Sequence, residues 1–185
     1  MTVKEVTHDT EIKMKKTVEA TQREFSAIRT GRASTALVDG VRVDYYGTAT
    51  PLKQLAAVTT PDARLILIQP WDKTILAEVE KAILKSDIGI TPTNDGKAIR
   101  LSIPPLTDER RVELDRILKK IAEDGRVSVR TARHTAIEAA RKLEKDKAIT
   151  EDARFESQEE VQKLTDKYIK DIDTLLAAKE KEIQG

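Results

Sequence analysis

Hydrophobic and polar positions recur with a helical period in both flanks of the chain. Apolar or small side chains return at steps of three and four, which is typical of one face of a helix. Glycine and proline, which interrupt helices, are almost confined to residues 31–105. The flanks therefore predict three long amphipathic helices packed as a bundle. The repeating positions are Met14, Val18, Thr21, Phe25 and Ile28, then Leu114, Leu118, Ile121, Ala132, Ala136, Ala139 and Leu143, and finally Val161, Leu164, Tyr168, Ile172, Leu175 and Ile183.

The second helix has a clear start signal. Pro104 and Pro105 block a helix, Thr107 is a suitable N-cap, and two acidic residues follow it. At ~1.5 Å per residue, a helix over 107–145 is on the order of 60 Å long. The third helix is expected to begin near Thr150. Rods of this length are not typical of a compact enzyme core.

The middle of the chain changes to a strand pattern. Residues 41–46 alternate like a half-buried strand, 64–69 resemble a more buried one, and 54–60 and 99–103 are further candidates. Residues 74–86 have helical spacing, and Gly89 follows as a terminator. We therefore predict an α+β protein in which a small α/β domain, 32–103, is inserted into a three-helix bundle, 1–29 and 106–185. The predicted hinges are 30–31 (Thr30 and Gly31) and 104–105 (Pro104 and Pro105).

Composition excludes several classes of site. The chain has no cysteine, which removes disulfide scaffolds and thiolate chemistry, and its two histidines cannot form a zinc cluster. No apolar run is long enough for a membrane span. Acidic residues near the N-terminus argue against a signal or transit peptide. We expect a soluble cytoplasmic protein that does not bind membranes.

Catalytic motifs are absent from the sequence. It contains no glycine-rich dinucleotide or phosphate-binding motif and no His-Glu-x-x-His. We therefore expect no catalytic residue, no metal and no cofactor. Two other classes stay open: an enzyme with a polar pocket in the α/β insert, and a coiled-coil adaptor that binds a protein partner with little salt dependence.

The second helix carries a cluster of arginines. Residues 106–145 have a net charge of +3, whereas 146–185 have −4. On a helical wheel, five arginines share an arc about 100° wide, and Asp115, Glu123 and Glu144 dilute its ends. Guanidinium groups bind phosphate in a bidentate manner, and aromatic residues for base stacking are scarce, so the pattern favours the backbone of folded RNA. The five are Arg116, Arg126, Arg130, Arg133 and Arg141, and Arg110 and Arg111 precede them.

Salt bridges to the acidic third helix would explain the same arginines without RNA. For an arbitrary helical protein this simpler interpretation is the favoured one. A second basic pair, Arg29 and Arg32, flanks the first hinge. Arg29 also suits a helix C-terminus, where positive charge is favourable.

Seven segments of the chain resemble the bacterial ribosome recycling factor family in order and spacing. Together they span essentially its full length. They are Ile28-Arg-Thr-Gly-Arg-Ala-Ser34, Asp44-Tyr-Tyr-Gly47, Thr50-Pro-Leu-Lys-Gln-Leu-Ala56, Ser86-Asp-Ile-Gly-Ile-Thr-Pro92, Pro104-Pro-Leu-Thr-Asp-Glu-Arg-Arg111, Val127-Ser-Val-Arg-Thr-Ala-Arg133 and Gln162-Lys-Leu-Thr-Asp166.

The resemblance implies a function in protein biosynthesis, after translation termination. It implies an elongated, L-shaped, tRNA-like monomer that binds the ribosome, mainly large-subunit ribosomal RNA. With elongation factor G and GTP, such a protein splits the post-termination ribosome into subunits, which releases mRNA and tRNA. It implies no enzymatic activity, because the partner hydrolyses the GTP.

The resemblance also implies which residues contact RNA. The RNA-contacting arginines of the family fall on Arg110, Arg130 and Arg133, and its Arg-Thr-Gly-Arg stretch falls on residues 29–32. The family usually has a second basic residue where this chain has His134, which we expect to weaken phosphate contact modestly.

Overall fold

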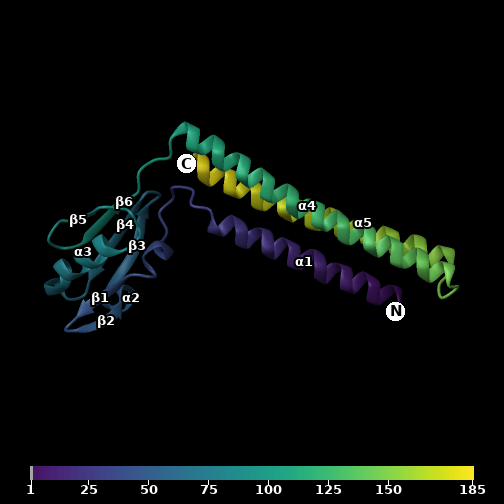
Figure 1. Cartoon of the computed structure of the whole chain (residues 1–185), viewed down its shortest axis with the longest axis horizontal. Helices are drawn as coiled ribbons and strands as arrows, with labels where there is room; N and C mark the ends of the chain where they lie inside the picture. Colours follow the sequence, from purple (N-terminus) through teal and green to yellow (C-terminus); the bar gives the residue numbers. More distant parts are fainter. Residues whose placement is uncertain (1) are drawn as a thin grey trace. The chain divides into compact units, whose positions relative to one another are not determined.

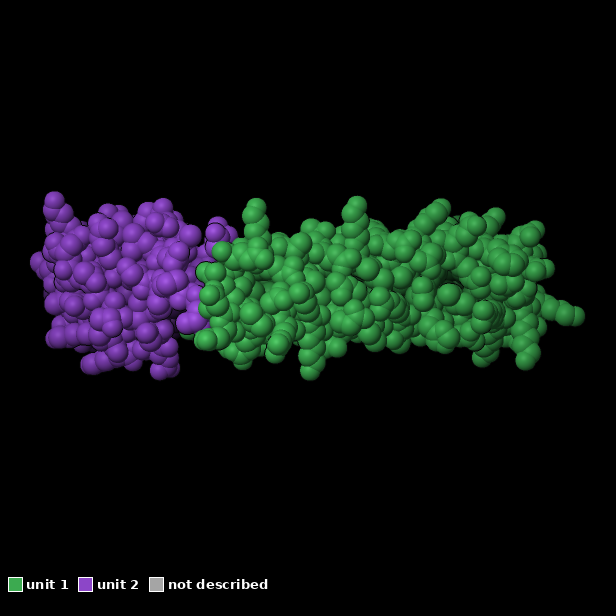
Figure 2. Space-filling model, turned by 90° about the horizontal axis from the view of Figure 1, so that it is seen from above, with its two compact units in different colours: residues 1–30, 108–184 green, residues 31–107, 185 purple. Residues whose placement is uncertain are grey.

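The computed structural model describes residues 2–185 and separates them into two compact units (Figure 2). Residues up to 30 and residues 108–184 form one unit, which we call the bundle domain. Residues 31–107 form the other, which we call the inserted domain. The chain therefore passes from one domain to the other twice.

The bundle domain consists of α1 (Val3–Ala27), α4 (Asp108–Lys145) and α5 (Glu151–Gln184). Each helix packs against the other two, and α4 runs opposite to α1 and α5 (Figure 1). Side chains cap the N-termini of α1 and α5. The Thr2 hydroxyl accepts a hydrogen bond from the Glu5 amide, and Thr150 does the same for the Ala153 amide. The three helices, and the start near Thr150, are confirmed.

The buried face of α4 is centred differently from the predicted seam. Ile121, Ala132 and Ala139 are only half-buried, whereas Ala122 and Val129 are inaccessible to solvent. The reason is that α4 packs against two helices, so its most buried line lies between the two contacts. The buried residues of α4 are Leu114, Leu118, Ala122, Gly125, Val129, Ala136 and Ala140.

Gly125 marks a close approach of the three helices. A Cβ atom on Gly125 would lie 2.6 Å from the Thr21 hydroxyl and 3.2 Å from Cδ1 of Ile172. Thr21 itself donates its hydroxyl to the Thr17 carbonyl at 3.0 Å, so this buried polar group is satisfied. A glycine in the middle of a long helix is therefore explained by packing.

The inserted domain has an antiparallel four-stranded sheet in the order β3-β4-β6-β5. Its core contains Ile66 and Ile68 of the central strand β4, together with Val79 and Ile83 of the covering helix α3. The elements are β1 (Arg42–Tyr45), β2 (Thr48–Pro51), α2 (Leu52–Leu55), β3 (Ala56–Asp62), β4 (Leu65–Pro70), α3 (Leu76–Lys85), β5 (Pro92–Asn94) and β6 (Ile99–Ser102), with 3-10 turns at Thr35–Val38 and Lys73–Ile75.

The strands expected at 41–46, 64–69 and 99–103, and the helix expected at 74–86, are confirmed to within a few residues. The candidate strand 54–60 is corrected, because its first residues belong to the short helix α2. The prediction omitted β2 and β5, which are short and contain proline and polar residues. No helix in the described part of the chain is long and apolar enough to cross a membrane.

Candidate nucleic-acid interface

The arginines of the predicted arc on α4 differ in how far they are buried. Arg126 and Arg133 are half-buried, since they occupy the edge of the helix that faces α5. Arg116, Arg130 and Arg141 are exposed. The predicted arc therefore divides into a packed edge and an open face.

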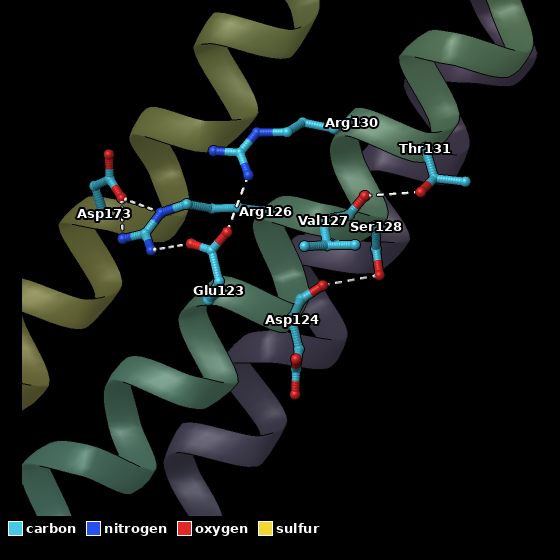
Figure 3. A network of polar contacts seen from close by, with 8 residues as sticks. All are labelled: Glu123, Asp124, Arg126, Val127, Ser128, Arg130, Thr131 and Asp173. Carbon is cyan, nitrogen blue, oxygen red and sulfur yellow. Dashed lines mark hydrogen bonds and ion pairs between the residues drawn. The ribbon is translucent and has the colours of Figure 1, made fainter.

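Arg126 joins α4 to α5 through a network of charged groups (Figure 3). Its Nε and Nη2 donate to one carboxylate oxygen of Asp173, at 2.8 and 2.6 Å, and its Nη1 donates to Glu123 at 3.0 Å. Only 20% of its side chain is exposed. The interpretation of these arginines as salt-bridge partners of the third helix thus describes Arg126 well.

Arg130 lies one turn further along α4 and shares an acid with Arg126. Its Nη1 donates to the second oxygen of Glu123 at 3.0 Å, while 47% of the Arg130 side chain remains exposed. The hydrogen bond from Arg126, and to a smaller extent that from Arg130, lowers the pKa of the Glu123 carboxyl. Glu123 is therefore ionised at neutral pH and holds two guanidinium groups at once.

Arg133 contacts α5 through a neutral group. Its Nη1 donates to the Gln162 side-chain oxygen at 3.3 Å, and the Gln162 amide nitrogen in turn donates to Asp166 at 2.8 Å. The Nε of Arg133 is buried and has no hydrogen-bond partner among the described residues. This arginine is positioned by α5, but no carboxylate in the described part of the chain neutralises it directly.

Three other arginines of α4 have acidic neighbours three residues away. Arg110 pairs with Glu113 at 2.6 Å, Arg141 with Glu138 at 2.8 Å, and Arg111 lies 3.8 Å from the carboxylate of Asp108. Exposed pairs of this kind are weak, so a phosphate can compete for these cations.

Arg116, Arg29 and Arg32 are exposed, and no salt bridge involves them within residues 2–185. Arg29 follows α1, whose C-cap is Ile28, and belongs to the bundle domain. Arg32 belongs to the inserted domain. Their charges are available to an anionic partner.

The predicted hinge residues have contrasting environments. The Thr30 side chain is buried and donates to Glu182 of α5 at 3.2 Å. Gly31 has a φ of +74°, and a Cβ there would approach Leu106 to 3.0 Å. Pro104 and Pro105 are exposed. On the bundle side of the first connection, Thr30 is therefore held by α5. On the other side, position 31 requires glycine because of its positive φ and the nearby Leu106 side chain.

A groove of about 580 Å³ lies between α1 and α5. Tyr168 is one of its lining residues, and the Tyr168 hydroxyl donates to Glu11 at 2.9 Å. Burial and this hydrogen bond raise the pKa of Tyr168 to about 12. Among residues 2–185, no group of three or more acidic or histidine side chains is placed to hold a metal ion.

Sequence reasoning missed the partners of the arginines. Glu123 was expected only to reduce the positive charge of the arc. It precedes Arg126 by three residues and Arg130 by seven, and both spacings place side chains on the same face of a helix. Asp173 and Gln162 lie on another helix, so their pairing with Arg126 and Arg133 depends on how α5 is aligned along α4.

Comparison with known proteins finds one family. The family model described as ribosome recycling factor matches residues 21–183. A ribosome-recycling factor of Oleidesulfovibrio alaskensis is 58% identical over 175 residues, which cover 95% of each chain. One from Thermosynechococcus vestitus is 59% identical and covers 95% of this chain and 96% of its own.

Solved structures give the same result. A solution structure of ribosome recycling factor is 44% identical, with a TM-score of 0.72 over 100% of this chain and 98% of its own. A T. thermophilus ribosome recycling factor, placed with E. coli elongation factor G on the E. coli post-termination complex, is 43% identical. Its TM-score is 0.64, and both chains are covered completely.

Proposed function

The chain belongs to the ribosome recycling factor family, and from that membership we propose the steps by which it acts. It binds the post-termination ribosome. With elongation factor G and GTP, it then splits the ribosome into subunits, so that mRNA and tRNA are released. The T. thermophilus relative placed with elongation factor G on a post-termination complex supports this choice of partners.

The arginine face of α4 supplies the anchor in this proposal. The observation that carries it is the pair Arg130 and Arg133, which project from one side of α4 and each donate through Nη1 alone to a protein side chain. Guanidinium groups with unused donors suit the phosphates of folded large-subunit RNA. Affinity should then fall steeply as salt rises.

Further cations extend the proposed contact. Arg110 and Arg111 lie in the first turn of α4, and Arg29 and Arg32 lie on either side of the first connection between the domains. Arg126 has the smallest role toward RNA, because acids of the protein engage all three of its guanidinium nitrogens. We propose that it aligns α4 on α5 instead.

The inserted domain transmits force in this proposal. Elongation factor G pushes on it during GTP hydrolysis, and it moves about hinges at 30–31 and 104–105. The chain itself performs no catalysis and needs no cofactor, since the partner uses the nucleotide. It acts as a monomer in the cytoplasm.

Sucrose-gradient profiles test the proposal. Post-termination ribosomes incubated with this protein, elongation factor G and GTP should convert from whole ribosomes to separate subunits, with an initiation factor added to prevent rejoining. Ribosomes that stay intact with an elongation factor from the same species would contradict the proposed function.

A further inference from the structure

The contact between Glu123 and Arg130 suggests a limit on the affinity for RNA, and this inference rests on the proposed function of Arg130. Glu123 is 52% exposed and uses one oxygen for Arg126 and the other for Arg130. Its carboxylate therefore occupies a position on Arg130 that a phosphate oxygen would take.

The two arginines are not equivalent toward Glu123. Arg126 is held a second time by Asp173 at 2.6 Å and is mostly buried, so its position is fixed. Arg130 has only Glu123 as a charged partner in the described residues and is about half exposed. An incoming phosphate therefore meets Arg130, which can move, beside Glu123, which Arg126 holds in place.

The charges of the network around Glu123 sum to zero. Asp173, Arg126, Glu123 and Arg130 form a continuous chain of two acids and two bases (Figure 3). A phosphate that binds Arg130 must either displace Glu123 or lie close to its negative charge. Displacement loses the ion pair between Glu123 and Arg130, and binding beside Glu123 brings two like charges close together, so both outcomes weaken binding.

We propose that Glu123 is an affinity-limiting residue, an internal counter-anion with which RNA competes for Arg130. A factor that must leave the ribosome after each round benefits from such competition. Loss of the carboxylate should therefore tighten binding and slow release, without changing the packing of α4 on α5, which Asp173 maintains through Arg126.

The chain offers a matched control in Asp124. Its side chain points away from Arg126 and Arg130, although it is adjacent in sequence and exposed (Figure 3). Glu123→Gln and Asp124→Asn remove the same charge from neighbouring positions. A general effect of net charge would change both variants equally, whereas the proposed competition would change only the first.

The test measures binding of the full chain to purified large ribosomal subunits at low and high salt. Glu123→Gln should bind about two to five times more tightly at low salt, as expected for removal of an exposed ion pair, and the gain should shrink as salt rises. Asp124→Asn should bind as the wild type does. In the background of Arg130→Ala, Glu123→Gln should give a much smaller gain. Thermal unfolding followed by circular dichroism verifies that each variant is folded.

Several outcomes would overturn the inference. They are unchanged or weaker binding of Glu123→Gln, an equal gain in Asp124→Asn, or an equal gain in the Arg130→Ala background. If Arg130→Ala alone leaves affinity unchanged, the anchor itself fails, and that result is separate from a failure of Glu123 to compete. Multiple-turnover recycling gives a second measurement, and it should slow in Glu123→Gln.

Discussion

Arginines at similar helical positions differ in how far the protein already satisfies them. Arg126 donates to two carboxylates and is mostly buried, whereas Arg133 donates to an amide and keeps a buried Nε without a partner in residues 2–185. Arg130 is intermediate, with one carboxylate and an open side. How available each arginine is to RNA therefore depends on its partners within the protein, and counting positive charges does not reveal those partners.

Replacing Arg133 should weaken ribosome binding. Arg133→Ala removes a guanidinium that no acid in the described residues neutralises, and a charge-assisted hydrogen bond contributes about 1.5–3 kcal/mol. We expect affinity for large subunits to fall about tenfold and the salt dependence to become shallower by about one phosphate contact. Co-sedimentation over a range of salt concentrations measures both quantities.

Arg23 provides the control for this variant. It is exposed on α1, and no salt bridge involves it in the described part of the chain. Arg23→Ala should leave binding unchanged. Equal losses in Arg133→Ala and Arg23→Ala would mean that total charge, and not the α4 face, determines affinity.

Tyr168 should make stability depend on pH in the alkaline range. Its pKa is raised to about 12 in the folded protein, from 10.0 as the ordinary value, so the unfolded chain loses its proton first. The contribution is complete below pH 10 and is lost as pH rises toward 12. At pH 11 we expect a loss of about 1 kcal/mol. Urea unfolding at pH 8.5 and 11 measures it.

Tyr168→Phe separates this effect from the titration of lysines. The variant lacks the hydroxyl that donates to Glu11, so it should be about 1 kcal/mol less stable at pH 8.5. Its free energy of unfolding should then fall less than that of the wild type between the two pH values. Identical falls would show that Tyr168 does not titrate differently in the folded state.

The sequence was sufficient to place five arginines within one arc of α4 but not to give their partners. The arc from Arg116 to Arg141 follows from helical periodicity alone, because α4 is one uninterrupted helix. The pairing of Arg126 with Asp173 joins positions 47 residues apart, so it depends on the alignment of two helices. Local periodicity contains no information about that alignment.

At the level of elements, α4 packs closely against both α1 and α5 at Gly125. Glycine costs about 1 kcal/mol relative to alanine in a helix interior, so Gly125 must be retained for another reason. The reason is space, since a methyl group there would lie 2.6 Å from the Thr21 hydroxyl.

Gly125→Ala should therefore destabilise the bundle domain. The overpacking cost of about 1–3 kcal/mol exceeds the gain in helix propensity. The cost should shrink in the background of Thr21→Ala, which removes the closer of the two contacts and leaves the one with Ile172 at 3.2 Å. Chemical denaturation of the wild type, the two single variants and the double variant measures the free energies of unfolding for this double-mutant cycle. If Gly125→Ala is stabilising in the wild-type background, the helices are free to separate at this point.

The predicted helices agree with the structure because long periodic segments have one stable interpretation, whereas short strands do not. Helix α4 starts where Pro104, Pro105 and Asp108 indicate it. Strand β5 has three residues and begins with Pro92, so nothing local marks it as a strand. It exists because β6 pairs with it.

At the level of the whole molecule, two connections link the domains. Gly31 requires a positive φ that proline cannot adopt, so Gly31→Pro would distort the first connection instead of stiffening it. Pro104 and Pro105 lie near the end of the inserted domain, just before the second connection. They are exposed, and each has a fixed φ, which makes this connection the better place to alter.

Replacing both prolines with glycine should uncouple the domains. The double variant Pro104→Gly and Pro105→Gly keeps the arginine face intact, so binding to large subunits should stay within about twofold of the wild type. A flexible connection transmits force poorly, and we expect subunit splitting to slow severalfold. Normal splitting with normal binding would contradict a mechanical role for this connection.

The most direct test of the account is the splitting reaction itself. Light scattering would follow post-termination ribosomes mixed with this protein, elongation factor G and GTP, with each component omitted in turn. The account predicts a fall in scattering that requires all three, and a much slower fall with the double variant Arg130→Ala and Arg133→Ala. A fall without this protein, or none with all three present, would contradict it.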